Sequence, residues 1–321
     1  MRAITYTAAG GAEVIRMAER PVPEPGAGQV RVRVRAAGLN RADILQRRGG
    51  YPAPAGWPED IPGLEFAGEV ESLGAGVSAW RVGDRVMGLV GGGAHAEAVV
   101  VNAAELLAVP AGLDWDQAAA IPEAFLTAWD ALLVRGRLRA GERVLIHAAG
   151  SGVGTAAIQV ARLVGAESVG TSRQAAKLER LRALGLDRGI DTSAGGFSEQ
   201  VAPGVDVALD VLGGPAFAQN LAALRAGGRL VLLGFLGGSR FEGDLSPILR
   251  KRLEVVGTVM RTRGPEERAA MAGTWAREIL PAFNDGRLRP VVGAVVPMAE
   301  VARAHALMEG NELFGKCVLR W

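Results

Sequence analysis

The sequence predicts an α/β protein in which a β-rich part precedes a doubly wound parallel sheet. From about Asp116 onward, short apolar runs alternate with Ala- and Leu-rich helical patterns, which is typical of the strands and helices of such a sheet. A glycine-rich turn joins the first of these strands to the first helix. The chain of 321 residues is long enough for two domains that each have a sizeable core.

The first part has the pattern of an irregular β domain with long loops. Residues 29–35, Q-V-R-V-R-V-R, alternate strictly, so the valines share one face and the arginines share the other. This alternation predicts a half-buried antiparallel strand. A loop rich in proline and glycine occupies residues 48–58. Further strands are expected at residues 68–72, Arg85–Leu89 and residues 94–101.

The second part contains short apolar runs without polar alternation, as strands buried on both faces require. Glycine-rich turns follow three of these runs, A-A-G-S-G-V-G, D-V-L-G-G and L-L-G-F-L-G-G. They lie at carboxyl ends of strands, which is where open α/β sheets bind ligands. The expected strands are residues 143–148, 168–171, 205–211, 229–235 and 253–260, with a weak strand near Ile190.

The last part of the chain mixes helices with strands, and it can return to complete the first domain. We expect a helix at residues 266–284 and a shorter helix at residues 299–308. Strands are expected at residues 291–295 and at residues 316–319.

The first glycine-rich turn indicates dinucleotide binding, because a strand precedes it and an amphipathic helix follows it. Such a turn presents backbone N–H groups and a helix N-terminus to a pyrophosphate. The glycine fingerprint is met strictly only at its last position, since Ala149 and Ser151, both small, occupy the other glycine positions. A purely structural strand–helix joint is the alternative. The expected cofactor contacts are Gly150, Ser151, Gly152, Val153 and Gly154.

The end of the second strand favours NADPH over NADH. Folds that prefer NAD usually carry Asp or Glu about 20 residues after the glycines, where it binds the ribose hydroxyls. This chain instead has Ser172 and Arg173, with Lys177 one helical turn further on, and these side chains can hold a 2′-phosphate. Solvated charges at a helix start are the alternative. We also expect cofactor contacts from Thr192 and Leu212, near the ends of later strands.

Composition excludes several classes of function. The 36 basic and 34 acidic residues nearly balance, and no basic stretch is interleaved with aromatic residues, so nothing points to nucleic acid. No apolar run is long enough for membrane insertion, and the N-terminus lacks a signal-peptide core. The single cysteine, Cys317, cannot form an internal disulfide. We therefore expect a cytoplasmic, reducing location.

Motifs spread over nearly the whole chain resemble the medium-chain dehydrogenase/reductase superfamily. Within it, the chain is similar to the zinc-free quinone oxidoreductases, most of all to their p53-inducible quinone oxidoreductase-like subgroup. The motifs keep the order of the family: A-A-G-L-N-R-A-D-I-L-Q-R-R-G-G-Y-P (36–52), P-G-L-E-F-A-G-E-V (62–70), V-G-D-R-V-M-G-L (82–89), A-A-A-I-P-E-A-F-L-T-A-W (118–129), the glycine turn, and L-F-G-K-C-V-L (313–319).

The resemblance implies an architecture and an assembly. A GroES-like catalytic domain is expected to comprise residues 1–122 and 264–321, with a Rossmann domain inserted at residues 123–263. The resemblance places the active site in a cleft between these domains. It also implies a homodimer that forms through the edge of the Rossmann sheet, near residues 253–260.

The resemblance bears on metal chemistry as well. Zinc-dependent relatives hold a catalytic zinc through Cys, His and a third ligand, and this chain has Asn40 and Leu64 at the Cys and His positions. His147 lies in a predicted buried strand, where core packing is the simpler role. We therefore expect no metal. Quinones and activated enones accept hydride without a Lewis acid, because the product anion is delocalised.

Three residues are predicted to act in catalysis: Tyr51, Asn40 and Thr127. By resemblance, Tyr51 faces the active cleft and gives the acceptor a hydrogen bond or a proton; packing on Trp57 or on prolines is the alternative. Asn40 matches a residue near the nicotinamide, and a helix cap or turn is its alternative. Thr127 resembles a cofactor-contacting threonine, whose alternative is a hydrogen bond to the preceding helical turn. The resemblance adds cofactor contacts at Gly234, Phe235, Leu236, Phe314, Gly315 and Lys316.

The sequence thus predicts NADPH-dependent reduction of a quinone, a small-molecule acceptor, by transfer of hydride or of single electrons. An NADPH-dependent enone or enoyl-thioester reductase on the same scaffold is the alternative among enzymes. A protein that binds NADPH with low turnover, in a structural or sensing role, is the alternative of another class.

Overall fold

The computed structural model describes residues 1–321, and the chain folds into two compact units. The β-rich unit comprises Met1–Glu123 and Met260–Trp321, and the parallel-sheet unit comprises Ala124–Val259. The sequence predicts domain boundaries after residues 122 and 263, whereas the chain passes from one unit to the other after Glu123 and after Val259. The predicted α/β class, with a β-rich part and a parallel sheet, is confirmed.

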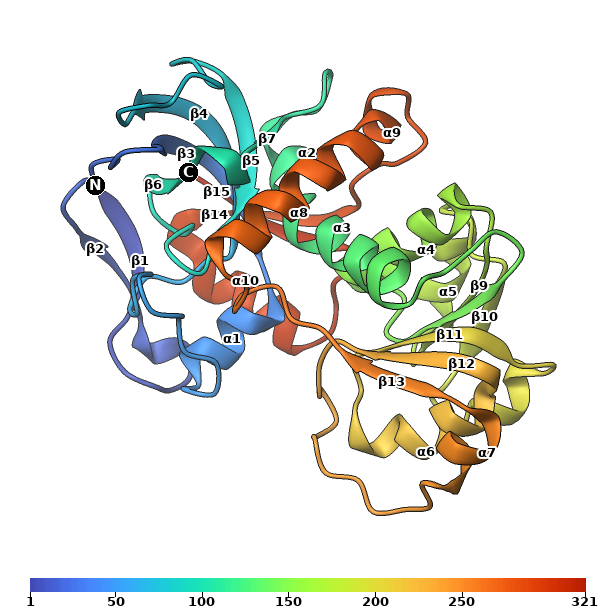
Figure 1. Cartoon of the computed structure of the whole chain (residues 1–321). Coiled ribbons are helices and arrows are strands. Elements are labelled where there is room, and N and C mark those ends of the chain that lie inside the picture. The colour runs from blue at the N-terminus through green and yellow to red at the C-terminus, as the bar shows by residue number, and fades with distance from the viewer. The chain divides into compact units, whose positions relative to one another are not determined.

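A seven-stranded sheet forms the centre of the β-rich unit, with the order β14-β15-β3-β4-β5-β7 and with β6 paired to β3. Strand β3 is antiparallel to β4, β6 and β15, so residues from both ends of the chain meet on it (Figure 1). The strands are β3 (Gln29–Leu39), β4 (Glu65–Leu73), β5 (Arg85–Leu89), β6 (Ala98–Asn102), β7 (Leu107–Ala108), β14 (Val292–Pro297) and β15 (Lys316–Arg320).

The alternation in β3 has the effect that the sequence predicts. Val30, Val32 and Val34 are buried in the core of the unit, because every second side chain points to the same face. The arginines on the other face pair with glutamates of β4, and Glu71 binds both Arg31 and Arg33. The strand therefore has one apolar and one charged face, and it continues beyond residue 35 to Leu39.

The structure differs from the expected elements in several places. Instead of one helix at residues 266–284, the chain forms α8 (Pro265–Glu278) and α9 (Pro281–Asn284), because Pro281 has no N–H to continue a helix. The expected strand at residues 94–101 starts later, at Ala98, since its first residues bond to β1 (Arg2–Tyr6) through Ile4 and His95. Strand β1 pairs with β2 (Ile15–Glu19) in a separate two-stranded sheet, which the sequence does not reveal.

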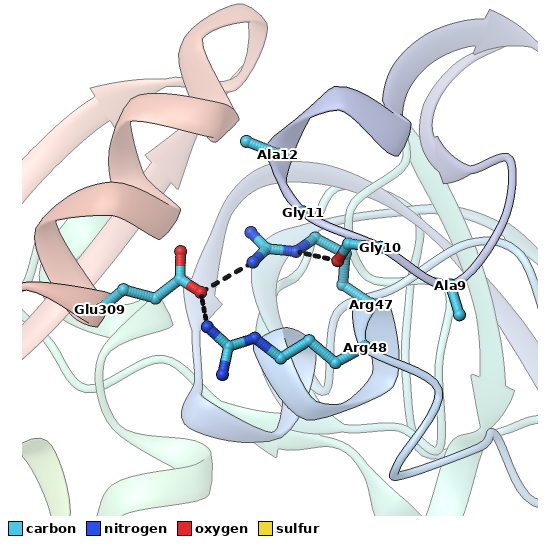
Figure 2. A pocket seen from close by; sticks show the side chains of 7 residues that line it. All are labelled: Ala9, Gly10, Gly11, Ala12, Arg47, Arg48 and Glu309. Carbon is cyan, nitrogen blue, oxygen red and sulfur yellow. Dashed lines mark hydrogen bonds and ion pairs between the residues drawn. The ribbon is translucent and has the colours of Figure 1, made fainter.

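Short helices complete the β-rich unit. Figure 2 shows how Arg47, at the end of α1, joins separate segments: its guanidinium donates to Gly10 O (3.2 Å) and to Glu309 Oε1 (2.7 Å). Arg48 also donates to Glu309, and these residues line a depression of about 440 Å³. The helices are α1 (Arg41–Arg47), α2 (Trp115–Ala119) and α10 (Val301–Glu309), with short 3-10 turns at Ala12–Val14, Ala103–Glu105 and Met298–Glu300.

The parallel-sheet unit contains a six-stranded sheet with the order β10-β9-β8-β11-β12-β13, and all its pairings are parallel. In chain order this is 3-2-1-4-5-6, the order of a dinucleotide-binding sheet, with the reversal between β8 and β11. The strands are β8 (Arg143–Ile146), β9 (Glu167–Ser172), β10 (Arg188–Asp191), β11 (Val205–Asp210), β12 (Leu224–Leu232) and β13 (Glu254–Gly257).

Helices connect the strands of this sheet (Figure 1). Helix α3 leads into a π-helical turn, and Leu145, Ala208 and Leu230 lie in the core between helices and sheet. Strand β13 is an edge strand, and dimerisation through it stays a prediction. No helix has the length and apolar character needed to cross a bilayer. The helices are α3 (Pro122–Trp129), the π-helix Asp130–Arg135, α4 (Gly152–Leu163), α5 (Ala175–Arg182), the 3-10 turn Ser198–Val201, α6 (Gly214–Ala223) and α7 (Ser246–Lys251).

Gly154 allows α4 to approach the end of β8. A Cβ atom at this position would lie 2.5 Å from the carbonyl oxygen of Ala149 and 2.7 Å from that of Ala148. Both neighbours are backbone atoms and cannot move aside cheaply. This is the role that the last glycine of the fingerprint has in helix–strand packing.

We predict that Gly154→Ala destabilises the protein by about 1–3 kcal/mol, since overpacking outweighs the better helix propensity of alanine. Thermal and urea unfolding would measure the loss. Gly257→Ala is the matched control, because a Cβ there meets nothing within 4 Å. Equal stability of the two variants would contradict this account of Gly154.

Candidate functional site

The glycine-rich turn has the geometry of an anion-binding helix start. Ser151 is the N-cap of α4, and its Oγ accepts a hydrogen bond from the Gly154 N–H (3.0 Å). The amides of Gly152 and Val153, in the first turn of the helix, have no acceptor within the helix. Together with the helix dipole, these groups can hold a phosphate.

Lys177 lies against this turn. A Cβ atom at Gly150 would be 3.0 Å from Cδ of Lys177, so the aliphatic part of the lysine packs on the turn. Partial burial lowers the pKa of Lys177, and the neighbouring cations Arg173 and Arg180 lower it further. Arg173 is exposed, while Ser172 Oγ accepts from the N–H of Gln174 (3.1 Å), the N-cap residue of α5. Lys177 therefore stands beside the turn with Arg173 near enough to act on its charge, and a phosphate would relieve the repulsion between the two cations.

Thr127 presents an unused hydroxyl. Its side chain on α3 is buried, yet Oγ1 has no hydrogen-bond partner. The alternative role, a hydrogen bond to the preceding helical turn, is therefore not what the structure shows. A buried polar atom without a partner costs free energy, so a bound ligand is a natural partner.

The remaining sequence-predicted contacts of this unit follow the ends of its strands. Thr192, after β10, donates its N–H to Ser172 O (2.9 Å), and Leu212, after β11, donates to Asp210 Oδ1 (2.7 Å). Gly234, Phe235 and Leu236 follow β12, and Phe235 and Leu236 are more than half exposed. Exposed apolar side chains at the carboxyl end of a parallel sheet suit the binding of a ring. The turn with its cations, Thr127 and these residues fit a dinucleotide.

The β-rich unit contains a buried polar cluster around Glu65, the first residue of β4. Lys316 Nζ lies 2.5 Å from Glu65 Oε1, and both side chains are nearly inaccessible, with 6% and 0% exposed. Asn40 Nδ2 donates to the same carboxylate oxygen (2.9 Å), and Lys316 Nζ donates to Asn40 Oδ1 (2.6 Å). Gly38 makes room for this carboxylate, since a Cβ there would lie 2.1 Å from Oε1.

Asn40 has the helix-cap role that the sequence offered as the alternative, and its place near the nicotinamide stays a prediction. It is the N-cap residue of α1, and its backbone N–H donates to Asp43 Oδ2 (2.7 Å). Its side-chain amide is held by Glu65 and Lys316 within the polar cluster. Lys316 also donates to Leu39 O (3.1 Å), so its ammonium is fully engaged in this unit. Phe314, two positions before Lys316 in the sequence, is buried. The cofactor contacts expected of Phe314, Gly315 and Lys316 stay predictions.

Tyr51 is held by Arg261, a residue that the sequence did not indicate. The guanidinium lies 4.9 Å from the centre of the Tyr51 ring and donates to Tyr51 O (2.8 Å). It also donates to Gln46 Oε1 (2.6 Å) and Gly91 O (2.8 Å). Burial raises the pKa of Tyr51, Glu123 raises it further, and Arg261 acts in the opposite direction. The phenol therefore keeps its proton at neutral pH.

Glu123 is a second site residue that sequence reasoning missed. Its N–H donates to Glu65 Oε2 (2.7 Å), and the residue as a whole is half-buried. Burial raises the pKa of Glu123 to about 7, with Glu65 and Asp43 adding to the effect and Lys316 and Arg261 opposing it. The sequence signal that could have indicated Glu123 is its place in the motif P-E-A-F-L-T, four residues before Thr127.

The histidines do not form a metal centre with other side chains. His147 is buried, and its ring contacts Thr171 Oγ1 (2.9 Å) and Asn220 Oδ1 (2.7 Å), so it packs in the core of the parallel-sheet unit. Leu64, at the position where zinc-dependent relatives carry a histidine ligand, is buried in the β-rich unit. No group of three or more His, Cys, Asp or Glu side chains is arranged to hold a metal ion.

Comparison with known families gives two matches along the chain. Residues 26–111 match the alcohol dehydrogenase GroES-like domain, and residues 152–276 match the zinc-binding dehydrogenase family. The chain is 34% identical to a quinone oxidoreductase of Rattus norvegicus, over 99% of this chain and 97% of that protein.

Solved structures of similar proteins agree with these family matches. A mycobacterial protein complexed with NADPH has a TM-score of 0.88 and 29% identity, with all of both chains covered. The CurK enoyl reductase also has a TM-score of 0.88 and 29% identity, covering 99% of this chain and 98% of that one.

We predict that Glu65→Gln destabilises the protein by about 3–5 kcal/mol, because Lys316 would keep a buried charge without a counter-charge. Urea unfolding would measure the change in the free energy of unfolding. Glu300→Gln serves as the control, since its ion pair with Arg303 is exposed and such pairs contribute less than about 1 kcal/mol. A similarly small effect of both variants would show that the buried pair does not carry this stability.

Proposed function

Because the chain belongs to the medium-chain dehydrogenase/reductase superfamily, we propose that it is an NADPH-dependent quinone oxidoreductase that works without a metal. The observation that carries the proposal is the Lys177 side chain packed on the glycine turn beside Arg173, with no carboxylate at the end of β9. The quinone oxidoreductase at 34% identity supports the acceptor class.

When bound, NADPH supplies a hydride from its nicotinamide ring. The amides at the start of α4 would hold its pyrophosphate, and Ser172, Arg173 and Lys177 would hold its 2′-phosphate. The buried hydroxyl of Thr127 would form a hydrogen bond with the nicotinamide half of the cofactor. These residues bind and orient the cofactor, which is the main task of a protein that uses nicotinamide chemistry.

The polar cluster of the β-rich unit would serve the acceptor. Tyr51 keeps its proton and can donate a hydrogen bond to a quinone oxygen, while Arg261 fixes the tyrosine. Asn40 is held by Glu65 and Lys316 in one orientation, so its position costs little reorganisation during the reaction. A quinone needs no stronger electrophile, because the negative charge that it acquires is delocalised over the ring.

An enone or enoyl-thioester reductase is the second candidate. The likeness to the CurK enoyl reductase favours it, because that protein shares the scaffold. Reduction of an activated double bond also requires a hydride and a proton. The two candidates therefore differ in the acceptor and not in the cofactor site.

We predict that replacing both Arg173 and Lys177 with alanine weakens NADPH binding about 100-fold and changes NADH binding little. Hydrogen bonds to charged groups contribute about 1.5–3 kcal/mol each, and NADH lacks the 2′-phosphate. Fluorescence titration with both cofactors would measure the two dissociation constants. Arg182→Ala, an exposed cation on the same helix, is the control. Equal weakening of NADPH and NADH would refute the phosphate assignment.

We expect the protein to consume NADPH when phenanthrenequinone or ortho-naphthoquinone is added, and to do so faster than with enones or enoyl thioesters. Loss of nicotinamide absorbance would report the rate for each acceptor. A clear preference for an enone or enoyl thioester would establish the second candidate. Tight NADPH binding without turnover of any acceptor would overturn the proposed activity.

A further inference from the structure

Glu123 occupies a defined place in the polar cluster of the β-rich unit. The two oxygens of the Glu65 carboxylate are shared: Oε1 binds Asn40 Nδ2 and Lys316 Nζ, and Oε2 accepts the N–H of Glu123. Glu65 thereby anchors the start of α3 to the same group that holds Asn40. The position of Glu123 is thus set by buried contacts and not by a mobile loop.

The carboxyl group of Glu123 differs from the two other carboxylates of the cluster. Glu65 is neutralised by Lys316, and Asp43 accepts hydrogen bonds from the N–H groups of Asn40 and Gly63. The carboxyl of Glu123 has no hydrogen bond or ion pair, and the residue as a whole is half-buried. An acid that is anchored through its backbone but unused by its side chain is a candidate for proton transfer.

Every charged group that acts on Glu123 belongs to the same unit. Glu65 on β4 and Asp43 on α1 disfavour its ionised form, while Lys316 on β15 and Arg261 favour that form. Burial is the largest effect, and together with Glu65 and Asp43 it outweighs the two cations. The charge of Glu123 also acts on Tyr51, which places the carboxyl within electrostatic reach of the phenol.

The helix that carries Glu123 also carries Thr127. The two residues are four positions apart in α3, so their side chains share one face of the helix. Thr127 Oγ1 is the buried hydroxyl without a partner. One helix face therefore offers an unused carboxyl group and, one turn later, an unused hydroxyl.

We propose that Glu123 is a further catalytic residue, whose carboxyl group gives its proton to the oxygen of the reduced acceptor. This inference rests on the proposed function. Tyr51 then has the role of a hydrogen-bond donor, because a phenol with a raised pKa gives up a proton less readily than a carboxylic acid that titrates near neutrality.

The proton transfer is the same for a quinone and for an enone. NADPH, when bound, would supply a hydride, that is one hydrogen with two electrons, and the acceptor would become an oxyanion. The O–H bond of the Glu123 carboxyl breaks as an O–H bond forms at that oxyanion. The Glu123 carboxylate then takes a proton from water, so NADPH and one proton are consumed for each acceptor reduced.

The test is Glu123→Gln, which keeps the size and polarity of the side chain but removes the transferable proton. With NADPH saturating and the best acceptor from the screen above, kcat of the variant should fall on the order of 100-fold. The wild-type kcat should decline as the pH rises through about 7, because the protonated acid is then lost, and the variant should lack this decline. Glu123→Asp should restore part of the rate and the pH dependence.

Glu199→Gln, an exposed glutamate on the 3-10 turn of the parallel-sheet unit, should leave rate and pH profile unchanged. If Glu123→Gln keeps the wild-type rate together with its alkaline decline, Glu123 is not the proton donor, while the proposed function stands. If the wild-type protein reduces no acceptor at all, the proposed function itself fails.

Stability gives a readout that does not depend on activity. The pKa of Glu123 is raised in the folded protein from its ordinary 4.5 to about 7, so its contribution to stability is lost as the pH rises through that range. The Tm of Glu123→Gln relative to wild type should therefore increase between about pH 5 and about pH 8. A Tm difference that is constant with pH would overturn the inference whatever the turnover.

Discussion

The buried ion pair between Lys316 and Glu65 joins segments that are far apart in the chain. Lys316 begins β15 near the C-terminus, Glu65 begins β4, and β3 lies between the two strands in the sheet. A buried ion pair is stable only when further hydrogen bonds satisfy both ions. Asn40, Leu39 O and the Glu123 N–H supply those bonds here, and so the pair determines where the candidate site residues of this unit lie.

The same pair separates the carboxylates of the site into different roles. Three acidic side chains, Glu65, Asp43 and Glu123, influence one another, and they cannot all carry a full charge in a partly buried cluster without compensation. Lys316 compensates Glu65, and backbone N–H groups compensate Asp43. Glu123 is left without a partner, and burial raises its pKa toward neutrality, with Glu65 adding to the effect. Three residues of one chemical type thereby acquire distinct environments.

In the parallel-sheet unit, the topology of the sheet has a comparable effect. Strands β8 and β9 are neighbours, so the loops after them meet at one edge of the sheet. The glycine turn and Lys177 are in contact for this reason, although 27 positions of sequence numbering separate Gly150 from Lys177. The relatives include a quinone oxidoreductase and an enoyl reductase, which shows that this scaffold serves more than one acceptor. The acceptor depends on the side chains around the reacting group.

Local patterns of the sequence determined much of the fold. Alternating valines specified the two faces of β3, unbroken apolar runs specified β8 and β11, and the glycine turn specified the start of α4, because periodicity and turn chemistry act over a few residues. The residue types after β9 led to the prediction of NADPH, which stays a prediction. The break between α8 and α9 was within reach of the sequence, since Pro281 is its cause.

Only the tertiary structure decided which side chains lose their charge, their water or their partners. The pairing of Lys316 with Glu65, the hold of Arg261 on Tyr51 and the raised pKa of Glu123 each require residues that are distant in the sequence. Burial and electrostatic interaction depend on distances in space, and no local pattern encodes those distances. The sequence therefore determined the kind of protein and its glycine-rich turn, and the folded chain decided the chemistry available to each acid.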